Sequence, residues 1–149
     1  MTFTPDPRGA WEDTDAAALG FSTERTRERC TVAARAASSK SGRDTVVLAV
    51  DRLLGLTDAF LITSGANPRQ VRTIGEEIER QLKLAGYGGP LCVEGTDDAR
   101  WVLMDFGDIV AHVFLEEARE FYDLEQLWGD APAWSWDDEA DELVASRKA

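Results

Sequence analysis

Trp-Val-Leu-Met-Asp-Phe-Gly-Asp-Ile-Val-Ala-His-Val-Phe-Leu, residues 101–115, is the stretch that decides the fold. It predicts two strands, 101–105 and 109–115, joined by a tight turn that contains a glycine. Because side chains alternate along a strand, Trp101, Leu103 and Asp105 share one face of the first strand, and the intervening residues share the other. We therefore take this pair as the starting point of a β-sheet.

Further strands and helices are predicted on both sides of this pair. Residues 45–50 and 59–63 are rich in β-branched and aromatic residues, which favours buried strands, and 91–94 is a short third strand. Good helix composition covers 24–40, and Asn67-Pro68 begins a second helix with an apolar face. That apolar face comprises Val71, Ile74, Ile78, Leu82 and Ala85, at spacings of three or four residues.

A third helix is predicted over residues 119–128, with Phe121, Leu124 and Trp128 on one side. The order is then helix, strand, strand, helix, strand, strand, strand, helix. This order predicts an α/β fold, with a mixed sheet of about five strands and helices packed on it.

The 149 residues suffice for one domain, and 44% of them are hydrophobic, which favours a folded chain over a disordered one. Acidic residues outnumber basic ones at both ends of the sequence. We therefore expect a polar N-terminal extension over 1–22, a folded domain over 23–128 and an acidic C-terminal tail over 129–149.

Composition narrows the class of protein. No apolar stretch approaches a membrane span, no secretory signal is visible, and the two cysteines form no ligand cluster, so we expect a cytoplasmic protein with free thiols. A net charge of -12 argues against direct, sequence-specific binding of nucleic acid. The same charge would steer the protein toward basic partners, although composition alone favours a role in solubility.

Asp105, Asp108 and His112 invite interpretation as a metal or acid–base site. The two aspartates flank a turn, where aspartate commonly binds backbone amides, and a metal site would need more ligands at defined spacing. His112 also fits a packed imidazole. The junction 63–68 could hold a phosphate, but it has a single glycine and lacks the known phosphate-loop patterns, so a turn and helix cap is favoured. No cofactor or metal is predicted.

Aromatic side chains gather in the last third of the domain, and each has two interpretations. Large aromatics are mostly buried in cores, yet they are also the residues on which protein interfaces depend. The residues concerned are Trp101, Phe106, Phe114, Phe121, Tyr122 and Trp128.

Two motifs give the chain a resemblance to a known family. Residues 101–113 read Trp-x-x-x-Asp-x-Gly-Asp-x-x-x-His-Val, and residues 121–128 read Phe-Tyr-x-Leu-Glu-x-Leu-Trp. With weaker matches at 46–50, 56–63, 69–72 and 94–95, the chain resembles the ribosomal silencing factor family, also called the Iojap family, from about residue 32 to residue 128. Ala49 departs from the polar strand residue usual in the family.

The resemblance implies a fold related to nucleotidyltransferases, but no catalysis, because the active-site motif of that superfamily is not present. It implies binding to the large ribosomal subunit through large-subunit ribosomal protein fourteen. It also implies a steric block of subunit joining that lowers translation, and homodimers are frequent in the family.

On the same resemblance, five residues are expected to form the docking surface for this partner. Trp101 and Tyr122 would be anchors, Asp105 would pair with a basic group, and His112 and Trp128 would contact the partner or support the surface from beneath. Two other functions stay open: an assembly factor for the large subunit, and a metal-dependent enzyme related to nucleotidyltransferases that uses Asp105 and Asp108.

Overall fold

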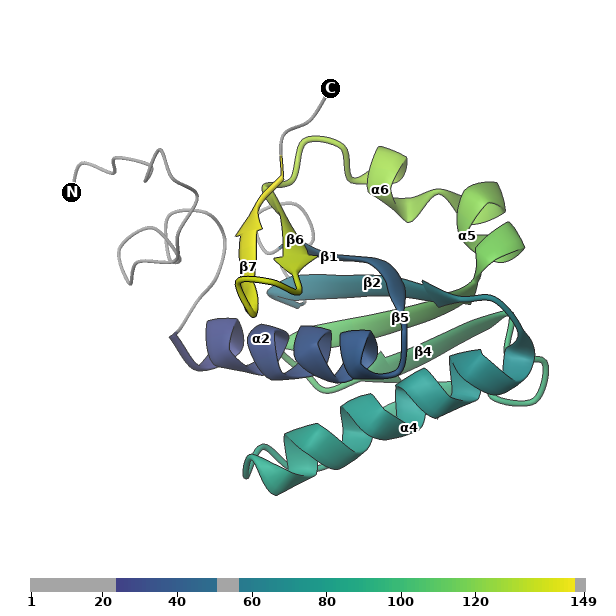
Figure 1. Cartoon of the computed structure of the whole chain (residues 1–149), viewed down its shortest axis with the longest axis horizontal. Coiled ribbons are helices and arrows are strands. Elements are labelled where there is room, and N and C mark those ends of the chain that lie inside the picture. Colours follow the sequence, from purple (N-terminus) through teal and green to yellow (C-terminus); the bar gives the residue numbers. More distant parts are fainter. Residues whose placement is uncertain (1–23, 51–56, 147–149) are drawn as a thin grey trace.

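The computed structural model describes residues 24–50 and 57–146, and its centre is a mixed β-sheet with helices on both faces (Figure 1). All five strands expected from the sequence are present. They are β1 (Arg43–Ala49), β2 (Ala59–Gly65), β3 (Cys92–Glu94), β4 (Trp101–Asp105) and β5 (Ile109–Leu115). The sheet order is β3-β4-β5-β2-β1-β6-β7, and the mixed α/β fold is confirmed.

The register of the central strands fixes which residues lie side by side. Strands β4 and β5 are antiparallel and place Trp101 opposite Phe114, while β2 and β5 are the parallel pair of the sheet. The turn between β4 and β5 contains Gly107 with φ +97, a conformation that glycine adopts without steric cost. The hairpin predicted from residues 101–115 is therefore confirmed.

Helices α2 (Glu24–Ser39) and α4 (Pro68–Leu84) cover one face of the sheet. The predicted apolar side chains of α4 are buried, but Ala85 is exposed because it caps the helix end. Asn67 caps the start of α4 and accepts a hydrogen bond from the backbone N–H of Gln70 at 2.9 Å. Gly75 faces β4, where an added Cβ would make an ordinary van der Waals contact, 3.5 Å from the Met104 sulfur.

The opposite face of the sheet is covered only in part, by two short helices at one end. The helix predicted over 119–128 is instead α5 (Glu116–Tyr122) and α6 (Leu124–Leu127). The break falls at Asp123, which has φ 47 in the left-handed region and so cannot continue a helix. We call residues 116–128 the arm, and Figure 1 shows it lying above the sheet, opposite α2 and α4.

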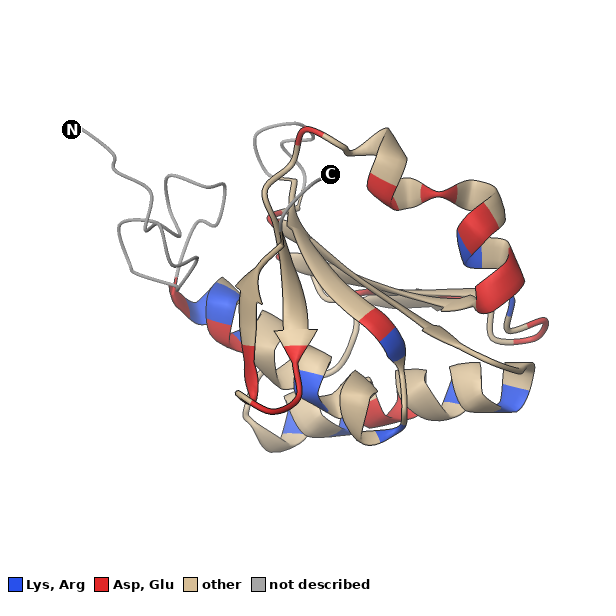
Figure 2. Ribbon diagram, turned by 45° about the horizontal axis from the view of Figure 1, so that its top comes forward, with Lys and Arg blue, Asp and Glu red and all other residues tan. Residues whose placement is uncertain are grey.

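The sheet continues past the boundary expected at residue 128, so the expectation of an acidic tail over 129–149 needs correction. Strands β6 (Ala133–Asp137) and β7 (Glu142–Ala145) extend the sheet from the edge of β1. Trp134 lies opposite Val47, is only 3% exposed and belongs to the core beneath α2. The acidic residues gather at the turn between the two strands (Figure 2). Their number makes the segment look like a solvated tail, although the alternating Trp134 and Trp136 are typical of a strand.

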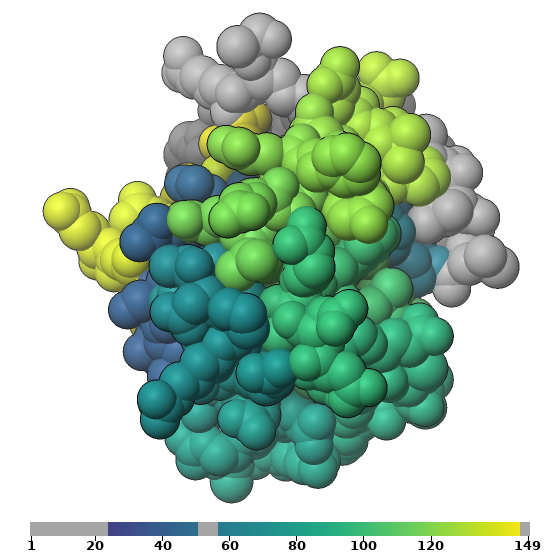
Figure 3. Space-filling view, turned by 90° about the vertical axis from the view of Figure 1, so that its right-hand side faces the viewer, coloured from purple at the N-terminus to yellow at the C-terminus, as the bar shows by residue number. Residues whose placement is uncertain are grey.

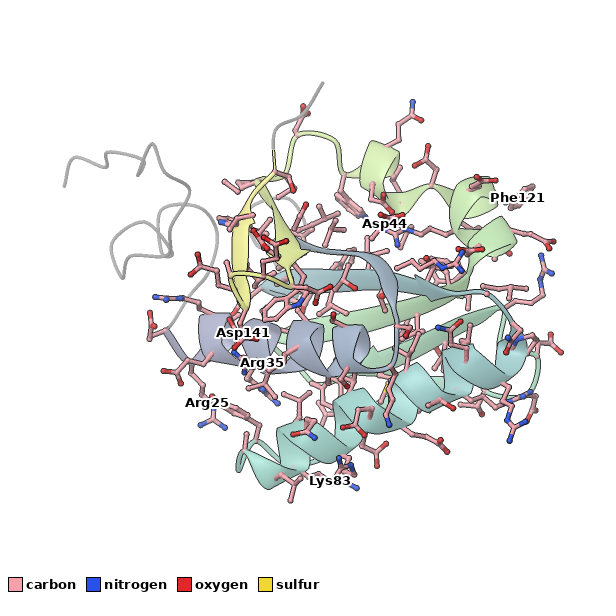
Figure 4. The ribbon with its side chains drawn as sticks, in the orientation of Figure 1. Arg25, Arg35, Asp44, Lys83, Phe121 and Asp141 are labelled. Carbon is pink, nitrogen blue, oxygen red and sulfur yellow. The ribbon has the colours of Figure 1, made fainter. Side chains whose placement is uncertain are left out.

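The hairpin of β6 and β7 is also tied to α2 at the surface. The Arg35 Nε donates to an oxygen of Asp141 at 2.8 Å, and its guanidinium lies over the Trp136 ring at 5.5 Å (Figure 4). Such exposed contacts add little free energy of folding. We therefore attribute the attachment of the hairpin mainly to the burial of Trp134.

The N-terminal extension expected over 1–22 lies outside the described residues. Within the described ranges, none of the helices combines the length and the apolar character needed to span a bilayer.

Candidate docking surface

The open face of the sheet carries the residues predicted to bind a partner. Along β4, Val102 and Met104 point into the core beneath α2 and α4, so Trp101, Leu103 and Asp105 point the other way. On this second face, no described helix packs over the part of β4 that carries Leu103 and Asp105, and both side chains stay partly exposed. This half-open sheet, bounded by the arm at one end, is the candidate docking surface.

Trp101 is the centre of an aromatic cluster on this face. Its ring stacks on Phe114 with centroids 4.9 Å apart and contacts Tyr122 of the arm at 4.7 Å. Phe114 is fully buried, whereas Trp101 is half-buried and Tyr122 is 47% exposed. Because neighbouring rings fix the indole, it can contact a partner with little further loss of side-chain entropy. The two side chains predicted as anchors, Trp101 and Tyr122, are therefore held in place by their neighbours.

His112 lies beneath Trp101. It is only 4% exposed, and its Nδ1 accepts a hydrogen bond from the indole Nε1 of Trp101 at 3.0 Å. Burial lowers the pKa of His112 to about 4, so the imidazole is neutral near pH 7. Since Nδ1 is the acceptor, the proton lies on Nε2, which is buried and has no hydrogen-bond partner among the described residues. The imidazole ring packs edge-to-face on Phe60, with ring centroids 4.6 Å apart. His112 thus orients Trp101 from below.

We expect His112 to make folding stability depend on pH. Its pKa is about 4 in the folded chain, below the ordinary histidine pKa of 6.5, so the unfolded chain binds more protons between these values. Stability should therefore fall as pH drops from 6.5 toward 4, by up to about 1.4 kcal/mol per pH unit from this residue. Urea unfolding at about pH 7 and about pH 5.5 measures the loss, and His112→Gln should show a smaller one. An equal loss in both proteins would contradict the assignment.

The other two predicted residues lie at different distances from the cluster. Trp128, at the end of the arm, is half-buried and contacts Phe60 edge-to-face at 6.0 Å, so it joins the cluster through that ring. Asp105 lies at the far end of β4, about 13 Å along the strand from Trp101 at the usual rise per residue. Its Oδ1 accepts from the backbone N–H of Gly107 at 2.8 Å, and the residue is partly exposed.

Two cluster residues were not among those predicted as site residues. Phe60 and Phe114 link Trp101, His112 and Trp128 from beneath, and both are buried. Phe114 could have been found from its place opposite Trp101 in the predicted hairpin. Phe60 could not, because its neighbourhood depends on the parallel pairing of β2 with β5, which local sequence does not specify.

The alternative interpretation of Asp105, Asp108 and His112 as a catalytic or metal site gains no support from their positions. Asp108 forms an ion pair with Arg29 and accepts a hydrogen bond from the Thr26 hydroxyl at 2.9 Å, away from the open face. Asp105 is engaged in its turn and His112 is buried. Across the described parts of the chain, no three His, Cys, Asp or Glu side chains are arranged to hold a metal ion.

Charge on the arm is strongly negative. Glu116, Glu117 and Glu120 lie on α5, and Figure 2 shows acidic residues along much of the arm. Figure 3 views the molecule from the right-hand side of Figure 1 and shows the arm in yellow-green near the top, above the start of α4. A surface with aromatic anchors and an acidic border is suited to a basic partner.

Comparisons with known proteins agree on one family. Residues 23–149 match the family model described as ribosomal silencing factor during starvation. A ribosomal silencing factor from Bacillus subtilis is 43% identical over 101 residues, which cover 68% of this chain and 85% of that protein. A mouse protein named mitochondrial assembly of ribosomal large subunit protein 1 is 33% identical over 108 residues, covering 71% of this chain and 46% of that protein.

Solved structures give the same result for the fold. A crystal structure of a Chromobacterium violaceum protein superposes with a TM-score of 0.67 at 34% sequence identity. The superposition covers 70% of this chain and 86% of that one.

Proposed function

Because the chain belongs to the ribosomal silencing factor family, we propose that it binds the large ribosomal subunit through large-subunit ribosomal protein fourteen and sterically blocks joining of the small subunit. Translation is lowered as a result, and no chemical step is needed, since occupying a shared surface is sufficient. The resemblance of residues 101–113 and 121–128 to the family motifs supports this assignment.

The observation that carries the proposal is the aromatic cluster at the border of an open sheet face. Trp101 and Tyr122 are partly exposed, yet both are held by buried neighbours. Interfaces obtain most of their binding free energy from a few such aromatic residues. In the proposed complex Trp101 and Tyr122 contact the ribosomal protein, and His112 and Trp128 support them from beneath.

Electrostatics agrees with a protein partner of positive charge. The chain carries a net charge of -12, so it is repelled by exposed ribosomal RNA and attracted by basic ribosomal proteins. Asp105 keeps one carboxylate oxygen outside its turn hydrogen bond, and we propose that this oxygen pairs with a basic side chain of the partner. A pair at the edge of an interface contributes mainly to orientation and association rate.

Sucrose-gradient sedimentation of purified ribosomal subunits, mixed under associating conditions with and without the protein, tests the proposal. We expect the protein to travel with the large subunit and the peak of joined ribosomes to fall. A protein that stays at the top of the gradient, with an unchanged joined peak, contradicts steric silencing.

An assembly role for the large subunit is the second candidate, because the mouse relative is named for that process. It involves the same particle at an earlier stage, so it predicts co-sedimentation with precursor particles and an unchanged joined peak in the mature-subunit experiment.

The remaining alternative, a metal-dependent enzyme that uses Asp105 and Asp108, predicts binding of a nucleotide with magnesium or manganese. Isothermal titration at millimolar concentrations measures such binding directly. Absence of binding heat would remove this alternative. The ion pair between Asp108 and Arg29 already argues against it.

A further inference from the structure

Arg119 lies between the arm and the sheet, and its side chain is only 12% exposed. One Nη donates to the carbonyl oxygen of Arg43 at 2.9 Å and to the Ser64 hydroxyl at 3.2 Å, and the other donates to the carbonyl oxygen of Asp44 at 2.7 Å. The Nε donates to a carboxylate oxygen of Glu125 at 3.0 Å. One guanidinium thus joins α5 to the start of β1, the end of β2 and α6.

An irregularity in β1 makes these carbonyl groups available. The pairing of β1 with β2 shifts register between Arg43 and Val46, and Asp44 has φ 48. A bulge of this kind takes backbone groups out of the ladder of the sheet. Figure 4 shows Asp44 beneath the arm, where its carbonyl oxygen accepts from Arg119.

Besides Arg119, the arm is held by the rings of Tyr122 and Trp128, which contact Trp101 and Phe60, and by an exposed ion pair between Arg43 and Glu116. Helix α5 buries Ala118 and helix α6 buries Leu124, one residue each. Phe121 is 79% exposed and points outward from α5 (Figure 4), and Leu127 is also exposed. Burial of an alanine and a leucine gives a short helix pair little stability of its own. Among the described residues, Arg119 therefore supplies most of the side-chain hydrogen bonds that fix the arm to the sheet.

We propose that Arg119 is the positioning residue of the docking surface, because its guanidinium sets where Tyr122 and Trp128 lie against the sheet. This inference rests on the proposed function, in which those two residues belong to the binding site. Arg119 itself makes no contact with the partner. It keeps the arm in the conformation that binds, and without it only a fraction of molecules present the complete surface.

Hydrogen–deuterium exchange of the full chain tests the first half of the inference without ribosomes. In Arg119→Ala the backbone amides of the arm should exchange faster, while those of α4 keep their protection. Arg119→Lys should not restore slow exchange, because a single ammonium cannot reach all four oxygen atoms that the planar guanidinium binds.

Binding to the large subunit tests the second half. If the arm is in place about a tenth of the time in Arg119→Ala, the apparent dissociation constant rises about tenfold. Arg72→Ala is the matched control, since Arg72 on α4 also donates to two backbone carbonyl oxygens, those of Thr96 and Asp97. It should change neither arm exchange nor subunit binding.

The outcomes separate this inference from the function on which it rests. Unchanged arm exchange in Arg119→Ala overturns the positioning role, and so does normal subunit binding by that variant. General loss of protection, including that of α4, would show a structural role for the whole domain instead. Failure of the unmodified protein to bind the subunit contradicts the proposed function, whatever Arg119 does to the arm.

Discussion

Trp101→Ala should weaken binding to the large ribosomal subunit by about 2 kcal/mol or more, which is roughly thirtyfold in the dissociation constant. The indole is half-buried and is held by Phe114, His112 and Tyr122, so its exposed part is fixed before the partner arrives. Truncation removes both the contact area and the ring against which Tyr122 packs. Titration of labelled protein with purified large subunits measures the change.

Trp136→Ala is the matched control for this experiment. Trp136 is also half-buried, but it lies on β6 beside Arg35, at the far side of the sheet from β4. We expect its loss to leave subunit binding nearly unchanged. Equal weakening by both variants would show that the loss reflects general destabilisation, and normal binding by folded Trp101→Ala would remove Trp101 from the site.

The supporting residues should respond differently from the anchors. Phe114 is fully buried, so its truncation would destabilise the domain before it affected binding. Tyr122 is nearly half exposed, so its truncation should act mainly on binding. If the interface is preorganised, truncation of a buried ring should mainly lower stability, and truncation of an exposed ring should mainly weaken binding.

Sequence periodicity predicted the central sheet and α4 because their signals are local. The alternation in residues 101–115 and the three-to-four spacing from Val71 to Leu82 each arise within one element. The helix break at Asp123 was missed, because an aspartate in the left-handed conformation has no distinctive local pattern. Strands β6 and β7 were missed because acidic residues at their turn dominated the composition of the segment.

The candidate site could be predicted from the sequence only in part. Trp101 and His112 share a face of neighbouring strands, and residues 101–113 resemble a family motif, so the sequence indicated that the two belong together. The burial of His112 depends in part on Phe60, which lies on another strand and which no local sequence pattern places beside it. Arg119 was missed because its partners include backbone carbonyl groups more than seventy residues away, at a bulge with no sequence signature.

Trp134→Ala should lower the free energy of unfolding by about 3–5 kcal/mol. Trp134 is 3% exposed and packs with the core beneath α2, so truncation leaves a cavity that neighbouring strands cannot close. Removal of every residue after 128 should cost more, since it also exposes the edge of β1. Chemical unfolding followed by circular dichroism measures both changes.

Trp136→Ala is again the control, because it tests whether the loss of stability comes from the burial of Trp134. Both tryptophans lie on β6, but Trp136 is only partly buried, so its loss should cost less than half as much as that of Trp134. A typical domain is stable by only about 5–15 kcal/mol, so the chain shortened at residue 128 should be largely unfolded at moderate temperature. If that shortened chain unfolds at the same denaturant concentration as the full chain, the folded domain ends where the sequence alone suggested. If it is unfolded, β6 and β7 are parts of the domain on which the docking surface depends.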